Sequence, residues 1–109
     1  RTSCATARSL AALLLLAGLA SAAQAQSGET QRLRSRALAA TCATCHGTDG
    51  RAVEGEALIR LAGMPADYTL TQLLAFRTGQ RPATIMHQIT KGYSQEQLEE
   101  VAKYFAAQK

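Results

Sequence analysis

The chain has 109 residues, with 12 lysines and arginines against 8 acidic residues and a net charge of +4. It contains no tryptophan, two phenylalanines and three tyrosines, so its own side chains can fill only a modest hydrophobic core. We expect one small domain from this length. The charge gives no support to nucleic-acid binding, because no basic patch is interleaved with stacking aromatic residues.

The first quarter of the chain has the pattern of a secretory signal. Arg1 and Arg8 make a positively charged start, an uninterrupted apolar run covers residues 10–20, and the small residues Ala23 and Ala25 occupy the two positions that a signal peptidase reads. The apolar run is about half as long as a membrane-spanning helix, so a membrane anchor is the weaker alternative. We predict a secretory signal that is cleaved after Ala25.

Cleavage at this point divides the chain into a signal peptide, residues 1–25, and one mature domain, residues 26–109. We expect the mature domain in the periplasm, without stable membrane insertion. The loss of two arginines lowers the net charge from +4 to +2, and Cys4 is removed with the signal. A domain of this size usually needs a metal or a cofactor to complete its core.

The first half of the mature domain predicts two helices joined by a loop. Residues 29–43 contain helix formers, no proline and apolar side chains at helical spacing, which predicts a first helix. Residues 47–63 contain four glycines without sustained periodicity, as expected for a loop that wraps around something. Pro65 stands where a first helical residue is often found, and the following apolar spacing predicts a second helix over 66–77 that stops at Gly79.

The second half predicts an irregular segment and then the most regular helix. Residues 78–93 include Pro82, and we expect part turn and part short helix there. Ser94 and Gln97 have the spacing of a capping box, and apolar residues continue at helical spacing up to Phe105. No alternation typical of strands occurs in the mature domain, so the predicted fold is all-α with three main helices.

The sequence Cys42-Ala43-Thr44-Cys45-His46 has the Cys-x-x-Cys-His order of c-type haem attachment. Two thiols separated by two residues at a helix end can form thioethers with the vinyl groups on one edge of a porphyrin. The adjacent histidine is then carried under the iron. We therefore predict Cys42 and Cys45 as the covalent attachment residues and His46 as an axial iron ligand. We also expect a hydrogen-bond acceptor in the following loop to hold the free ring nitrogen of His46.

Three other interpretations of the two cysteines are weaker. A thioredoxin-like redox pair would need a βαβ context, which the sequence lacks. A structural zinc site would need four ligands, and three of the four available Cys and His residues are crowded into five positions. A simple disulfide would explain the cysteines of an exported protein but neither His46 nor the missing core.

An iron bound by one histidine has a second axial position, for which Met86, Met64 and His87 are candidates. Met64 directly precedes Pro65 and the second helix, which would require a short wrap around the haem edge. Met86 lies 40 residues after His46, in a segment that can fold back over the opposite haem face. We predict Met86 as the second ligand and keep Met64 as a competitor. We expect His87 to be a surface or loop histidine.

A histidine and methionine ligand pair leaves no open position on the iron and raises the reduction potential. Such a site suits electron transfer and disfavours substrate chemistry at the metal. The predicted protein is therefore an electron carrier and not an enzyme by itself. A haem sensor or a peroxidase-like enzyme is the alternative from another class, and it requires that Met86 does not bind iron.

Three stretches, residues 42–50, 61–86 and 91–109, resemble the cytochrome subunit of flavocytochrome c sulfide dehydrogenase. The resemblance implies an all-α class I cytochrome c fold with one covalent haem c and Met86 as the distal ligand. In that family an FAD-containing flavoprotein subunit oxidises sulfide, so the complex is a sulfide–cytochrome c reductase. The cytochrome subunit takes the electrons and passes them to a soluble acceptor such as another cytochrome c. A free-standing, diffusible monohaem cytochrome c that serves another periplasmic redox enzyme is the alternative.

The chain departs from similar sequences at two positions near the predicted site. Those sequences tend to have a proline near Ile59 and a glutamine near Met64. The first difference leaves open which carbonyl meets the His46 ring, and the second leaves Met64 as an alternative ligand. Arg77, Arg81 and Lys91 fall near the expected haem edge, where they could steer docking to an acidic partner or could merely be solvated.

Overall fold

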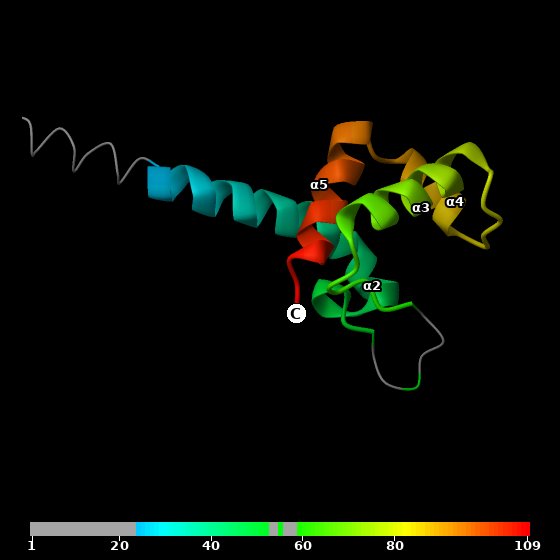
Figure 1. Ribbon diagram of the computed structural model, residues 1–109, viewed down its shortest axis with the longest axis horizontal. Helices are drawn as coiled ribbons and strands as arrows, with labels where there is room; N and C mark the ends of the chain where they lie inside the picture. Colours follow the sequence, from blue (N-terminus) through cyan, green and yellow to red (C-terminus); the bar gives the residue numbers. More distant parts are fainter. Residues whose placement is uncertain (1–23, 53–54, 56–58) are drawn as a thin grey trace, which may run out of the picture. The chain divides into compact units, whose positions relative to one another are not determined.

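The computed structural model describes residues 24–52, 55 and 59–109 (Figure 1). The predicted signal peptide falls outside the described residues except for its last two positions, and Cys4 also lies outside them. The signal and its cleavage after Ala25 therefore stay predictions. The chain divides into two units, residues 1–33 and 34–109, and the second unit holds every predicted site residue. In the first unit, residues 24–33 are helical.

The second unit is built from helices, and its described residues contain no strand. The all-α prediction is therefore confirmed. In chain order it contains helical residues 34–39, the 3-10 turn η1 (Ala40–Cys42), α2 (Ala43–His46), the 3-10 turn η2 (Thr48–Gly50), α3 (Ala66–Thr78), α4 (Met86–Lys91) and α5 (Gln95–Ala106).

The first predicted helix is correct in place but not continuous. The α-helical residues stop at Ala39, a tighter 3-10 turn follows, and α2 forms one further turn that ends at His46. The backbone N–H of Gly47 still bonds the Ala43 carbonyl at 3.0 Å, after which the chain leaves the helix with φ of 80° at Gly47. The two cysteines of the motif therefore lie on two successive short elements.

The two later main helices match their predictions closely. α3 begins one residue after Pro65, which occupies the N-cap and not the first helical position, and it ends at Gly79 in the left-handed conformation. α5 has the predicted capping box: the Gln97 N–H donates to Ser94 Oγ, and the Ser94 N–H donates to Gln97 Oε1. The irregular segment before α5 contains the expected short helix, α4.

α3 packs against both α4 and α5 (Figure 1). The hydrophobic core forms around one face of α5. The core is small. Among the described residues, the buried apolar side chains are Ala39, Leu98, Val101, Ala102 and Phe105. Cys42 and Tyr93 are half-buried against this cluster, which places the first cysteine of the motif at the core surface. No helix in the described ranges is long and apolar enough to cross a membrane.

Candidate functional site

The two motif cysteines occupy different environments. Cys42 ends η1 and packs against the core cluster, whereas Cys45 in α2 is exposed. Burial is the main cause that raises the pKa of the Cys42 thiol above its ordinary value. Neither sulfur takes part in a disulfide. The structure therefore gives no support to the disulfide interpretation and leaves both sulfurs available for thioether bonds.

His46 is held in the way that an axial ligand requires. Its Nδ1 lies 2.7 Å from the backbone carbonyl oxygen of Ile59, so the ring nitrogen on this side is engaged. Nε2 is left as the nitrogen that can bind a metal, and the bond fixes the orientation of the ring. The expected loop acceptor is thus present, and it is the carbonyl at the position where similar sequences tend to have proline.

A tight turn after His46 and two backbone hydrogen bonds to Gly50 place Ile59 beside His46. A side chain at Gly47 is excluded, because a Cβ there would lie 2.0 Å from the Arg51 carbonyl oxygen. Further on, the carbonyl of Gly50 accepts hydrogen bonds from the backbone N–H groups of Leu61 at 2.8 Å and Ala62 at 3.0 Å. These bonds anchor the returning chain just after Ile59.

The two methionine candidates lie on different sides of α3 in the sequence. Met86 is half-buried and begins α4, where its carbonyl accepts a hydrogen bond from the Thr90 hydroxyl at 2.9 Å. Thr90 is buried, so this bond helps to fix the helix that carries Met86. Met64 is half-buried in the turn before α3, and its N–H bonds the Leu61 carbonyl at 3.1 Å. Met86 lies in the segment beyond α3, and its role as the second ligand stays a prediction.

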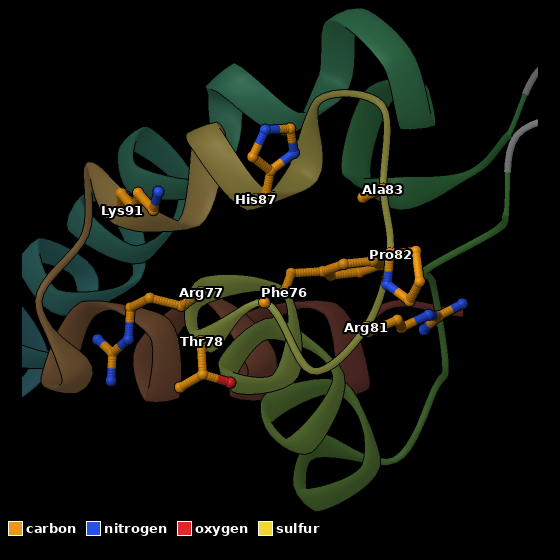
Figure 2. A pocket seen from close by; sticks show the side chains of 9 residues that line it. Phe76, Arg77, Thr78, Arg81, Pro82, Ala83, His87 and Lys91 are labelled. Carbon is orange, nitrogen blue, oxygen red and sulfur yellow. The ribbon is translucent and has the colours of Figure 1, made fainter.

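The expectation for His87 was wrong. It lies in the first turn of the α4 helix, half-buried, and its Nδ1 is enclosed without a hydrogen-bond partner among the described residues. Together with Lys91 it forms one wall of a cavity of about 290 Å³ whose other walls are α3 and the loop that follows it (Figure 2). The cavity is lined by Phe76, Arg77, Thr78, Gly79, Arg81, Pro82, Ala83, His87 and Lys91.

The donor set fits a covalently bound haem better than a bare metal ion. The described residues contain no group of three or more His, Cys, Asp or Glu side chains that could hold a metal ion by themselves, which argues against zinc. Two unpaired thiols, an oriented imidazole and a thioether on another element are the groups that a c-type haem takes. Large apolar side chains that a porphyrin could cover are also exposed: Ile59, Tyr68, Ile85 and Ile89.

An all-helical unit with this attachment motif and an oriented histidine defines the class of c-type haem proteins. Residues 34–109, which are the whole second unit, match the Cytochrome c family, and the chain belongs to that family. It is an electron-transfer protein that carries covalently bound haem c.

Several relatives of known name are similar to this chain. The cytochrome subunit of sulfide dehydrogenase from Chlorobaculum tepidum is 36% identical over 72 residues, which are 66% of this chain and 64% of that protein. The thiosulfate dehydrogenase electron acceptor of Stutzerimonas stutzeri is 42% identical over 91 residues, 84% of this chain and 42% of that protein. Cytochrome c-554(548) of Halomonas halodenitrificans is 38% identical over 73 residues, 62% of this chain and 84% of that protein. The chain spans less than two thirds of the length of the first two relatives.

Proposed function

We propose that this chain is a periplasmic monohaem cytochrome c that takes electrons from an FAD-containing sulfide dehydrogenase subunit. It passes them to a soluble acceptor such as another cytochrome c. The similarity to the Chlorobaculum tepidum cytochrome subunit supports this partner. The observation that carries the electron-transfer site is the 2.7 Å contact between His46 Nδ1 and the Ile59 carbonyl, because it prepares the imidazole for iron.

The residues of the proposed site have separate tasks. Cys42 and Cys45 would form the two thioether bonds to the haem, and His46 and Met86 would bind its iron. When bound, the haem supplies a one-electron iron couple. The chain holds the imidazole at a fixed angle through Ile59 and keeps the methionine on a helix that packs against α3. With His46 and Met86 both bound to it, the iron would have no position left for a substrate, which suits electron transfer.

The first experiment tests the ligand pair. The haem-loaded mature protein should show the weak near-infrared charge-transfer band of a methionine sulfur bound to ferric iron. We expect this band to disappear in Met86→Ala and to survive in Met64→Ala, which is the matched control. The reverse result would make Met64 the ligand. If the wild-type protein lacks the band and binds cyanide readily, its iron site is open and the sensor or peroxidase-like alternative replaces the carrier.

The second experiment tests the partner and the compartment. The exported protein should have the mass of residues 26–109 plus one haem, and it should co-purify with a subunit that contains FAD. The similarity to the Stutzerimonas stutzeri electron acceptor favours a second candidate, a diffusible cytochrome that serves another periplasmic redox enzyme. Isolation of the protein as a single haem-containing chain that accepts electrons from such an enzyme would support this candidate.

A further inference from the structure

Asp49 occupies an unusual position three residues after His46. It lies in η2 with φ of 55°, and it is the only described residue other than glycine with a positive φ. Residues without a glycine's freedom adopt this conformation at a cost, and such strain persists only where surrounding contacts hold it. The contacts of the Asp49 side chain therefore have to hold the residue in this conformation.

The Asp49 carboxylate joins three parts of the second unit. The Tyr104 hydroxyl, on α5, donates to Oδ1 at 2.5 Å. Arg36 Nε, on the helical residues 34–39, lies 3.9 Å from the same oxygen, and Arg51 Nη1 lies 3.5 Å from Oδ2. Only 21% of the Asp49 side chain is exposed, so these interactions are partly shielded from water. The carboxylate thus fixes η2 against two helices.

Backbone hydrogen bonds connect the segment that holds Asp49 to the proposed axial ligand, His46. The next residue, Gly50, is buried, and its carbonyl bonds the N–H groups of Leu61 and Ala62. Those two bonds set the place of the returning chain, and the Ile59 carbonyl at its start accepts the hydrogen bond of His46 Nδ1. A shift of η2 therefore moves the acceptor away from the imidazole.

We propose that Asp49 is a positioning residue for the axial histidine. By fixing η2 it keeps the Ile59 carbonyl on His46 Nδ1 and so sets the donor strength of the imidazole and the reduction potential of the iron. This inference rests on the proposed function in one respect, the role of His46 as ligand. A stronger imidazole donor stabilises the ferric state, so loosening of η2 raises the potential.

Two variants separate positioning from simple charge. Asp49→Asn removes the carboxylate charge but keeps a side chain that tolerates a positive φ. Tyr104→Phe removes only the hydroxyl that holds the carboxylate and leaves the charge in place. If Asp49 acted by charge alone, the loss of a hydrogen bond to it would leave its negative charge less neutralised and lower the potential. Positioning predicts the opposite sign, a higher potential in both variants.

The test uses the haem-loaded protein. In the ferrous form we measure by NMR the exchange rate of the His46 Nδ1 proton, and by redox titration the potential. We expect roughly tenfold faster proton exchange in both variants, because Asp49→Asn loses the ion pairs with Arg36 and Arg51 and Tyr104→Phe loses the hydroxyl that donates to Asp49. Asp67→Asn, an exposed aspartate in the first turn of α3, makes the same charge change and should leave the exchange rate unaltered.

Unchanged exchange of the His46 proton in both variants would overturn the positioning role, even if both proteins were less stable. A lower potential in Tyr104→Phe would overturn it as well and leave Asp49 as a local charge. The methionine charge-transfer band of the wild-type protein reports separately on the proposed function. If the wild-type spectrum shows that histidine does not ligate the iron, the proposed function fails first and the positioning role with it.

Discussion

Gly50 shows how a single backbone position controls the packing beside the site. It is buried with φ of 74°, and a Cβ there would lie 2.7 Å from Phe105 Cδ1 and 2.9 Å from Leu61 Cβ. Phe105 is among the most completely buried side chains described, so it has little room to move. The close approach lets the Gly50 carbonyl reach the returning chain that carries Ile59.

We therefore expect Gly50→Ala to destabilise the haem-loaded protein by about 2–4 kcal/mol, from overpacking and from left-handed strain together. Gly79→Ala is the matched control, because Gly79 has a similar φ of 78° but no atom within 4 Å of the added Cβ. The control should lose only about 1 kcal/mol. Denaturant unfolding followed through the haem absorption measures both values, and equal losses would show that the contact with Phe105 is unimportant.

For single residues, the sequence is more informative about roles that depend on a particular side chain than about roles of the backbone. The order and spacing of Cys42, Cys45 and His46 are a specific pattern, so the sequence alone is enough to propose them as the attachment residues and the axial histidine. The partner of His46 is a backbone carbonyl, which any residue supplies, so only the fold could identify Ile59. The role of Asp49 could not be predicted, because an aspartate next to a glycine is common in loops.

The N-terminus of α5 is the best-defined helix end in the molecule. The reciprocal bonds of Ser94 and Gln97 satisfy two backbone N–H groups that the helix itself leaves without partners. Ser94 Oγ also donates to the Glu96 carboxylate at 2.7 Å, and this bond is the main cause that lowers the pKa of Glu96 below its usual 4.5. Ser94 therefore stabilises the start of α5 in two ways, through the neutral capping bonds with Gln97 and through its hydrogen bond to the charged Glu96 carboxylate.

We expect Ser94→Ala to lower the free energy of unfolding by about 1 kcal/mol, because the capping box is lost. Part of this loss depends on pH. A carboxyl whose folded pKa is lowered stabilises the fold above its unfolded pKa, and the stabilisation is lost as the pH falls through the folded value. The difference between wild type and variant should therefore shrink as the pH falls below about 4.5. A difference that stays constant with pH would assign the whole effect to the neutral cap.

Helices were predictable where a capping or stop signal accompanied the apolar spacing. α3 and α5 have such signals at Gly79 and Ser94, and their bounds follow the predictions to within about a residue. The break after Ala39 had no signal, since the following residues are good or neutral helix formers until Gly47. Tertiary packing decides there: Tyr93, from the turn before α5, donates to the Leu38 carbonyl at 3.2 Å and also bonds Thr41.

The composition of the whole chain correctly predicted a sparse core. The described part buries only a few apolar side chains, and four large ones in the second unit stay exposed. A domain of this kind gains much of its stability from the cofactor that it encloses. The position of Met86, in contrast, follows from the path of the chain after α3, which the composition does not encode.

Charge is unevenly paired across the second unit. Arg34, Arg36 and Arg51 each lie within 4 Å of a carboxylate. The arginines that line the α3–α4 cavity form hydrogen bonds with neutral partners instead: Arg77 bonds the Gln95 amide oxygen at 3.4 Å, and Arg81 bonds Gln72. The charge of Arg77 also helps, as a minor cause, to lower the pKa of Glu96. Arg81 also stacks over the Phe76 ring at 4.6 Å.

This uneven pairing predicts a docking surface for an acidic protein. Figure 2 shows Arg77 and Arg81 at opposite ends of the cavity, with Lys91 on the facing helix, so their charges are spread along its rim and do not converge on one small anion. Among the described residues, none of the three forms an ion pair with a carboxylate. The cavity adjoins the start of α4, where Met86 lies, so a partner docked there would approach the proposed haem site.

Lys91→Glu should therefore slow the second-order reduction of the cytochrome by its electron donor by roughly tenfold at low salt, because unlike charges at an interface accelerate the encounter. Stopped-flow rates at increasing ionic strength give the measurement, and the two proteins should converge as the charges are screened. Lys103→Glu makes the same change on an exposed lysine of α5 outside the cavity and should have a much smaller effect. If both substitutions lowered the second-order rate constant equally, net charge alone would govern the encounter. The donor would then not dock at the α3–α4 cavity.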